Sequence, residues 1–277
     1  MLLLIRDTKG SMVSEIKSAI EGREVIIWGA RIVGIGLKRY FEKLNIKVIG
    51  FIDSDNSLWG KEIHSCRVYS PENIDNLIDQ SKVKPIEIII AVSIKEDEIA
   101  SMVYKYVRRE IDVKLIFYSR YFKSFYTMDI VGGCNLACSS CAHSLIDHGV
   151  PIGNMKIDNV KKVIEKIMLE DPGSTHISLY SWGEPLLHPK LPDIIKLFHD
   201  VGMAVGVSTN LSHHDVEKID GLVKAAPDYI KISLSGYYPD VYNSTHQGGN
   251  IDLVKSNLYR LRYMMDRHKK SPLVDIN

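Results

Sequence analysis

The sequence predicts an α/β protein in which a doubly wound parallel sheet is followed by a partial (β/α) barrel. Short apolar runs typical of buried strands alternate with stretches of helical periodicity along most of the 277 residues. Such alternation is typical of parallel sheets with crossover helices. The alternation pauses near residue 120 and restarts at Thr127. We therefore expect two domains, residues 1–120 and 121–277.

The composition excludes several classes of protein. Lys and Arg number 35 against 34 Asp and Glu, for a formal charge of +1, so neither a nucleic acid nor a membrane surface is an expected partner. No run approaches the roughly 18 apolar residues of a spanning helix, and the apolar start at residues 1–5 is too short for a signal peptide. Three of the four cysteines are clustered, which indicates metal chemistry in a reducing compartment. A cytoplasmic location follows.

Strands and helices alternate in the first domain. Apolar residues on one face predict a helix after the first strand, and a second amphipathic helix is expected at 99–109. The strands are expected at 24–28, 47–52, 86–92 and 113–117.

The loop after the first strand carries part of a dinucleotide-binding pattern. Gly29 and Gly34 occupy the outer glycine positions, and Asp53 follows about twenty residues later. Arg31 occupies the middle position, where the backbone has to approach a pyrophosphate closely. The loop therefore either forms a nucleotide site at Gly29, Gly34 and Asp53, or belongs to a sheet that only scaffolds or dimerises.

Repeated βα units predict a parallel barrel or partial barrel in the second domain, with its chemistry at the carboxyl ends of the strands. The predicted strands are 127–131, 176–180, 204–208, 229–234 and 272–276. The predicted helices are 158–169, 191–201, 214–225 and 251–267.

A cysteine triplet follows the first of these strands. Cys134, Cys138 and Cys141 have the spacing C-x3-C-x2-C, and three thiolates can hold three corners of a cubane cluster that usually takes four. The remaining iron would then be open, as in catalytic metal centres. His143 extends the run, so a Cys3His zinc site and a chance cluster of buried thiols are alternatives. Cys66 lies far away in the sequence and is interpreted as a packing residue.

Polar motifs follow the next three strands in order. They are Trp182-Gly183-Glu184-Pro185, Ser208-Thr209-Asn210 and Ser233-Leu234-Ser235-Gly236. Together with the triplet, they make residues 126–277 resemble the radical S-adenosylmethionine (SAM) superfamily.

The resemblance implies a [4Fe-4S] cluster on Cys134, Cys138 and Cys141, and SAM as second cofactor. Glu184 would face the ammonium group of SAM and is the candidate catalytic residue. The enzyme would cleave SAM reductively and abstract hydrogen from a substrate, with a reductant such as flavodoxin or ferredoxin. The implied SAM-binding residues are Gly183, Glu184, Pro185, Ser208, Thr209, Asn210, Ser233 and Ser235.

Residues 50–71 resemble Rossmann-like modules found beside sugar-modifying and surface-glycan enzymes. This second resemblance implies a small-molecule or sugar substrate, such as a nucleotide-sugar or glycan precursor. Two alternatives stay open: a peptide-modifying radical SAM enzyme, and a non-catalytic or truncated cluster-binding barrel that acts as a binding module.

The sequence departs from the family pattern at three points. Ser140 replaces an aromatic residue that often precedes the last cysteine, and Gln247 stands where relatives often carry Arg. The sequence also reaches only a fifth strand where the partial barrel of relatives has six. We therefore expect a barrel truncated at about strand five, with an open side.

Overall fold

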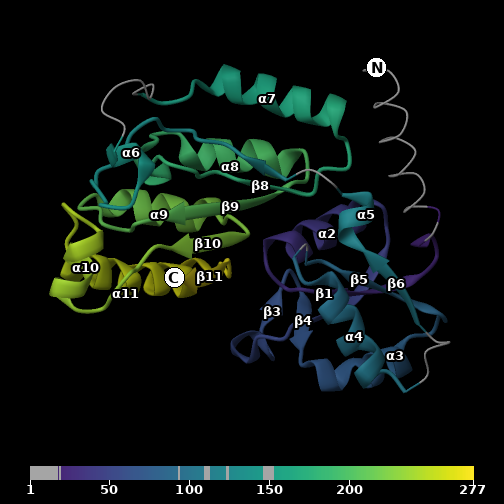
Figure 1. Ribbon diagram of the computed structural model, residues 1–277. Coiled ribbons are helices and arrows are strands. Elements are labelled where there is room, and N and C mark those ends of the chain that lie inside the picture. Colours follow the sequence, from purple (N-terminus) through teal and green to yellow (C-terminus); the bar gives the residue numbers. More distant parts are fainter. Residues whose placement is uncertain (1–17, 19, 93, 109–112, 123–124, 146–152) are drawn as a thin grey trace. The chain divides into compact units, whose positions relative to one another are not determined.

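Figure 1 shows a computed structural model of the chain, which describes residues 18, 20–92, 94–108, 113–122, 125–145 and 153–277. The apolar start of the sequence, residues 1–5, lies outside the described residues. The chain divides into two compact units. Unit 1 comprises Met1–Phe125 and Lys166–His176, and unit 2 comprises Tyr126–Glu165 and Ile177–Asn277. None of the helices described is long and apolar enough to cross a membrane.

Six strands form the sheet of unit 1: β1 (Glu24–Trp28), β2 (Lys47–Ile52), β3 (Glu62–Ile63), β4 (Cys66–Tyr69), β5 (Ile86–Ile90) and β6 (Val113–Phe117). Their order is β3-β4-β2-β1-β5-β6, and only β3 and β4 are antiparallel. The strand order reverses between β1 and β5, and in doubly wound sheets the carboxyl ends at such a point flank a crevice. Both central strands are buried throughout, which explains their continuous apolar sequences.

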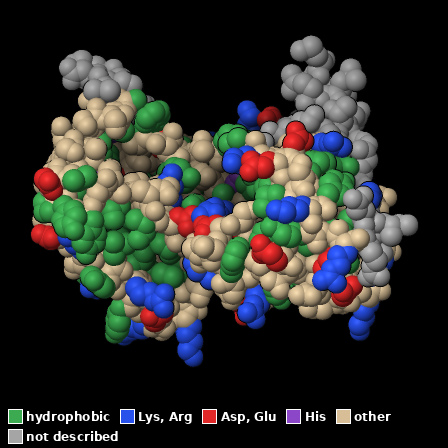
Figure 2. Space-filling model, turned by 60° about the horizontal axis from the view of Figure 1, so that its bottom comes forward, with side chains coloured by type: hydrophobic (Ala, Val, Ile, Leu, Met, Phe, Trp, Pro, Cys, Tyr) green, Lys and Arg blue, Asp and Glu red, His purple; other side chains and the backbone are tan. Residues whose placement is uncertain are grey.

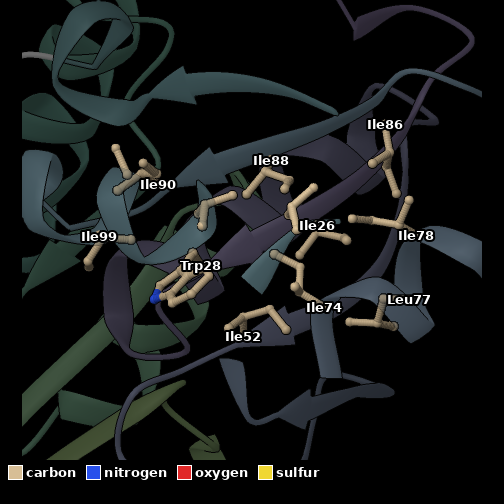
Figure 3. Close-up of a cluster of buried hydrophobic side chains, with 13 residues drawn as sticks. Ile26, Trp28, Ile52, Ile74, Leu77, Ile78, Ile86, Ile88, Ile90 and Ile99 are labelled. Carbon is tan, nitrogen blue, oxygen red and sulfur yellow. The ribbon is translucent and has the colours of Figure 1, made fainter. Parts of the chain in front are cut away.

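Helices cover this sheet and complete a shared core. Figure 3 shows Ile26 and Ile88 from the strands packed with Ile74 and Leu77, while Ile99 lies near Ile90 and Trp28. Burial of each such side chain stabilises the fold by about 1.5–3 kcal/mol. The helices are α2 (Ile32–Lys43), α3 (Ile74–Gln80), α4 (Glu96–Tyr106) and α5 (Tyr118–Tyr121), with 3-10 turns η1 (Asn56–Leu58) and η2 (Pro71–Asn73).

Five strands form the second sheet: β7 (Tyr126–Thr127), β8 (His176–Ser178), β9 (Ala204–Thr209), β10 (Tyr229–Ile232) and β11 (Leu273–Ile276). Their order is β11-β10-β9-β8-β7. The pairs β7–β8, β9–β10 and β10–β11 are parallel. Sequential strands are therefore neighbours, and their carboxyl ends lie along one edge.

Helices α8, α9 and α11 lie side by side and pack against one another (Figure 1). Asp215 accepts a hydrogen bond from the backbone N–H of Glu217 and caps α9, and Asn250 caps α11 in the same way. The helices along this part of the chain are α6 (Ala142–Leu145), α7 (Ile157–Glu170), α8 (Leu191–Asp200), α9 (Val216–Ala225), α10 (Pro239–Thr245) and α11 (Ile251–His268), with a 3-10 turn η4 (Pro185–Leu187).

The predicted elements differ from the observed ones mainly at their ends. The predicted strand 127–131 shortens to β7, because the chain beyond Thr127 leaves the ladder to contact the turn after β8. The predicted strand 86–92 ends at Ile90. The predicted helix 99–109 begins earlier, at Glu96, where three acidic residues fill its first turn and favour a helix N-terminus. Arg109, its predicted end, lies outside the described residues.

Charged side chains of both signs are interspersed on one face of the protein. On the face that Figure 2 shows, Lys and Arg lie among Asp and Glu, with no large patch of one sign. This distribution agrees with the formal charge of +1.

Candidate active site

The cysteine triplet lies on the loop that follows β7. All three thiols are free and half-buried. The backbone turns tightly here, since the N–H of Cys141 donates to the carbonyl of Cys138 at 3.1 Å. Two further backbone bonds tie the loop to the end of α10: Ala137 N–H to the Gln247 carbonyl at 2.9 Å and Ser139 N–H to the Thr245 carbonyl at 3.2 Å. The loop is thus anchored at the edge of the second sheet.

Asn210 connects the end of β9 to this loop. Its amide nitrogen lies 3.7 Å from the Cys134 sulfur and 2.9 Å from the Asn135 side-chain oxygen. The Leu136 N–H also points to the Cys134 sulfur, at 3.4 Å. Donors aimed at sulfur stabilise a thiolate and tune an iron–sulfur cluster.

Burial raises the pKa of both the Cys134 and the Cys138 thiol. The neighbouring Glu184 carboxylate and the other two cysteines raise the pKa of Cys134 further, although the Leu136 N–H opposes them. A metal centre removes this penalty, because coordination deprotonates a thiol and neutralises its charge.

Glu184, after β8, is only 3% exposed. One carboxylate oxygen accepts from Leu186 N–H at 3.0 Å and from the Thr209 hydroxyl at 2.8 Å, and the other accepts from Asn210 N–H at 2.9 Å. A carboxylate offers about four acceptor positions, so one remains, on the second oxygen. Glu184 therefore joins the β8 turn to the end of β9 and keeps capacity for one more donor.

Gly183 packs directly against the start of the cysteine loop. A Cβ at this position would lie 1.9 Å from the Val131 carbonyl oxygen, which only glycine avoids. The adjacent N–H of Glu184 donates to the Gly133 carbonyl at 2.9 Å. Pro185 then opens the η4 turn and is buried.

Asp129, which follows β7, binds the backbone of the same turn, a role that the sequence analysis missed. Its carboxylate accepts from the backbone N–H groups of Ser181, Trp182 and Gly183 at 2.9–3.2 Å. The only sequence signal was an acidic residue in an apolar strand, five positions before the first cysteine.

The remaining predicted residues lie at the ends of β9 and β10. Thr209 is buried and bonds to Glu184, while Ser208 and Ser233 are half-buried. Ser235 is exposed, with its hydroxyl 3.0 Å from Nδ1 of His246. His246 stacks on Tyr242 with ring centroids 4.6 Å apart, and burial lowers the pKa of its imidazole. Ser140 and Gln247, the two departures, are both exposed.

His213 is a second residue that the sequence analysis missed. It is 5% exposed, and its Nε2 lies 3.5 Å from Glu184 without a hydrogen-bond partner among the described residues. Asn257 fixes its backbone by donating to the His213 carbonyl at 2.8 Å. A His after a strand-end Asn carries no recognisable signal in a single sequence.

The donor set fits a cubane cluster. Each thiolate of a cubane binds a different iron, and three thiols on one loop, with N–H donors at one sulfur, suit that arrangement. In the part of the chain described, no three His, Cys, Asp or Glu side chains converge closely enough to hold one ion.

In unit 1 the predicted nucleotide residues come together at the carboxyl ends of β1 and β2. Asp53 is 8% exposed, and its two oxygens accept from Ala30 N–H at 2.8 Å and Asp55 N–H at 2.9 Å. Arg31, in the middle glycine position, pairs with Asp55 at 2.8 Å, and this bond lowers the pKa of Asp55 to about 2.

Gly29 has φ +111°, and a Cβ on Gly34 would lie 1.8 Å from the Gly29 carbonyl oxygen. Backbone conformation and packing are therefore enough to explain why glycine stands at both positions. A cavity of about 530 Å³ nevertheless lies at this edge, lined by Trp28, Gly29, Arg31 and Asp53 among others.

Comparison with known proteins identifies the second half of the chain. A family model described as the Radical SAM superfamily matches residues 128–269, just over half of the chain. The chain is 31% identical over 146 residues to a probable GTP 3′,8-cyclase of Methanococcus maripaludis (51% of this chain, 46% of that protein). It is 26% identical over 117 residues to an AdoMet-dependent heme synthase of Methanosarcina barkeri (42% and 32%).

Among solved structures, BtrN in complex with AdoMet and 2-DOIA aligns with a TM-score of 0.39 at 17% identity, over 55% of each chain. The chain spans less than half the length of the two curated relatives. The family match includes the cysteine triplet, the Glu184 turn and both later strand ends. The chain therefore belongs to the radical SAM superfamily, whose cofactors are a [4Fe-4S] cluster and S-adenosylmethionine.

Proposed function

We propose that the chain is a radical SAM enzyme in which Cys134, Cys138 and Cys141 hold the cluster. One observation carries the proposal: the three free thiols share a loop that backbone bonds fasten to both the Glu184 turn and the end of α10. Asn210 supplies a donor to the Cys134 sulfur from the neighbouring strand end. The thiols are thus positioned before any cluster binds, which reduces the ordering cost of binding.

SAM would bind beside the loop, along the ends of β8, β9 and β10. Glu184 has one acceptor position left, and an ammonium group is the donor that a buried carboxylate favours most. The cofactors supply the one-electron chemistry that splits SAM and abstracts hydrogen from a substrate. The other residues proposed to contact SAM are Gly183, Pro185, Ser208, Thr209, Asn210, Ser233 and Ser235.

The chain's own contribution is to orient and to exclude water. Glu184, Thr209, Asn210 and His213 are all at least nine-tenths buried, so contacts between them and SAM would form away from solvent, where they are stronger. Asp129 fixes the turn that carries Gly183 by three backbone bonds. No side-chain acid or base is needed for the first step.

The substrate is proposed to be a nucleotide-sugar or glycan precursor. Support comes from residues 1–120, whose strand order β4-β2-β1-β5-β6 is that of a Rossmann-like module. A dinucleotide bound in the usual manner is disfavoured, because both oxygens of the Asp53 carboxylate already accept backbone N–H groups and Arg31 is paired with Asp55 in the middle glycine position. A peptide substrate remains the second candidate, and a flavodoxin or ferredoxin is the proposed reductant.

Reductive cleavage of SAM tests the proposal against a non-catalytic, cluster-binding barrel. The anaerobically reconstituted chain is mixed with SAM and dithionite, and 5′-deoxyadenosine is measured by chromatography. We expect its formation with the native chain and its loss in Cys138→Ala. An iron-loaded chain that binds SAM but forms no deoxyadenosine would establish the binding-module alternative.

A further inference from the structure

A cavity of about 440 Å³ lies beside the cysteine loop, next to the turn proposed to hold SAM. Gly183 and Val131, which pack against each other, form part of its wall. Met155 also lines it, and His188 fixes this residue by contacting its carbonyl oxygen at 3.0 Å through Nε2. The polar or aromatic side chains that line the cavity are Asp129, His143, Asn154, Asn159 and Trp182. The proposed SAM ligands Ser208, Ser233 and Ser235 lie at the ends of the later strands β9 and β10 and are not among its lining residues.

His143 lines this cavity and carries an unused hydrogen-bonding atom. Its Nδ1 is inaccessible to solvent and has no partner among the described residues. A buried nitrogen without a partner costs about 1–3 kcal/mol, so a ligand toward which the imidazole turns from the cavity wall would be stabilised.

The cavity offers a ligand no cation among the residues described. No Lys or Arg is among the described residues that line it, so it lacks the cations that a phosphate needs. Its one carboxylate, on Asp129, accepts the backbone N–H groups of Ser181, Trp182 and Gly183 mainly through Oδ1, while Oδ2 shares only the Trp182 N–H at 3.2 Å and can accept from a hydroxyl group. The complement of this lining is a molecule without negative charge that can both donate and accept hydrogen bonds.

Trp182 adds a flat apolar surface. Its side chain is 53% exposed, while its backbone N–H is held by Asp129 at 3.0 Å. The indole face of Trp182 can pack against the C–H face of a saturated ring, and the amides of Asn154 and Asn159 can bond to hydroxyl groups.

We infer that this cavity binds the substrate through a neutral, hydroxylated ring such as a sugar. The ring stacks on Trp182 and bonds to His143 Nδ1. A phosphate attached to the ring would lie outside the cavity. The inference rests on the proposed function, because it gives the reacting part of the substrate a place beside the SAM turn.

Saturation-transfer NMR with the full, reconstituted chain tests this inference. The probes are methyl α-D-glucopyranoside, glucose 1-phosphate and N-acetylalanine methylamide, each with the native chain and with Trp182→Ala, Trp182→Phe and His143→Leu. Tyr259→Ala is the control, because Tyr259 is an exposed aromatic residue of the same unit that does not line this cavity.

We expect the glucoside to bind the native chain, Trp182→Phe and Tyr259→Ala similarly, and Trp182→Ala about fivefold or more weakly, as loss of an aromatic contact implies. His143→Leu should weaken it as well. Glucose 1-phosphate should bind no more tightly than the glucoside. Iron content and the SAM dissociation constant, measured on the same samples, report on the proposed function separately.

Three results would overturn the inference while cluster and SAM binding persist. The first is no transfer to the glucoside with the native chain. The second is transfer that survives both Trp182→Ala and His143→Leu. The third is preferential binding of the phosphate or of the peptide probe, which would indicate an anion or peptide site.

Discussion

Each sheet carries a tightly packed glycine and a buried carboxylate at its carboxyl edge, but the two edges differ in what the chain leaves without a partner. In unit 1, Asp53 and Arg31 are bonded to neighbouring residues of the loops after β1 and β2, and the indole N–H of Trp28 has no partner among the described residues. In unit 2, three thiols outside any disulfide share one loop, and among the described residues the buried nitrogens His143 Nδ1 and His213 Nε2 have no hydrogen-bond partner.

Groups without a hydrogen-bond partner are what distinguishes a candidate ligand site from a turn that is only well packed. Glycine and carboxylate at strand ends are what any tight turn between parallel strands requires. Buried polar groups are normally satisfied within a protein, so unsatisfied ones beside a proposed cofactor site point to a ligand. By this criterion we propose the edge of the second sheet as the reactive one.

The largest expected effect comes from the two packing glycines. Gly183→Ala places a Cβ 1.9 Å from a carbonyl oxygen, and Gly34→Ala places one 1.8 Å from another. Each should cost about 3 kcal/mol of unfolding free energy, the upper end for overpacking. Only Gly183→Ala should also abolish SAM binding, measured by calorimetry on chains loaded with iron. Equal loss of SAM binding in Gly34→Ala would break the comparison.

A smaller effect is expected from neutralising the two carboxylates. Glu184→Gln should weaken SAM binding by about 1.5–3 kcal/mol, typical of hydrogen bonds to charged groups, with the cluster retained. The NH2 group of the new amide would replace one carboxylate oxygen and could not accept the hydrogen bonds that Leu186 N–H, the Thr209 hydroxyl or Asn210 N–H donate to Glu184. Asp53→Asn is the matched control in unit 1 and should leave the SAM dissociation constant unchanged. An unchanged constant in Glu184→Gln would remove Glu184 from the site.

Asn210→Ala should change the electronic properties of the cluster without removing it. The Asn210 amide lies 3.7 Å from the Cys134 sulfur, and loss of a hydrogen bond to sulfur lowers the reduction potential of a cluster. A redox titration followed by electron paramagnetic resonance measures this shift. Asn257→Ala, which loses bonds to the Leu211 and His213 carbonyls instead, should not shift the potential. Equal potentials in all three chains would show that Asn210 does not act on the sulfur.

The smallest effect concerns the Arg31–Asp55 pair of unit 1. The bond from Arg31 lowers the folded-state pKa of Asp55 to about 2, so it stabilises the fold above pH 4 and is lost as the pH falls toward 2. Both side chains are partly exposed, which limits the effect to about 0.5 kcal/mol. The free energy of unfolding is measured by denaturant titration of the apo protein at pH 7 and at pH 2.5. The native chain should lose about 0.5 kcal/mol more between these two pH values than Arg31→Gln does. Loss of SAM binding in the reconstituted variant at pH 7 would assign Arg31 to the cofactor site after all.

The sequence was sufficient for most strands and helices because buried strands and amphipathic helices have distinct periodicities, but the short strands β3 and β4 and the helices α3 and α10 were not predicted. Val216–Ala225 and Ile251–His268 begin within two residues of their predicted starts. The short β7 was not predictable, since Asp129 leaves the strand to bind a turn more than fifty residues later. Contacts at that sequence separation leave no local pattern.

The candidate site was predictable to a similar extent. The Cys134 thiol, Glu184, Thr209 and Asn210, all predicted as site residues, lie together. Their mutual bonding was not foreseen: Glu184 was expected to face only a ligand, yet three donors of the chain already contact it. His213 and Asp129 were missed because a single His or Asp has many ordinary explanations in a sequence.

Iron and sulfide content per chain tests the central claim most directly. The native chain and Cys66→Ala, both reconstituted without oxygen, should each hold about four irons and four sulfides. Cys66 is buried in unit 1, where burial raises the pKa of its thiol to about 11 and disfavours the thiolate that a metal requires. Joint replacement of Cys134, Cys138 and Cys141 by alanine should abolish iron binding. Loss of the cluster in Cys66→Ala, or its survival in the triple variant, would contradict the account.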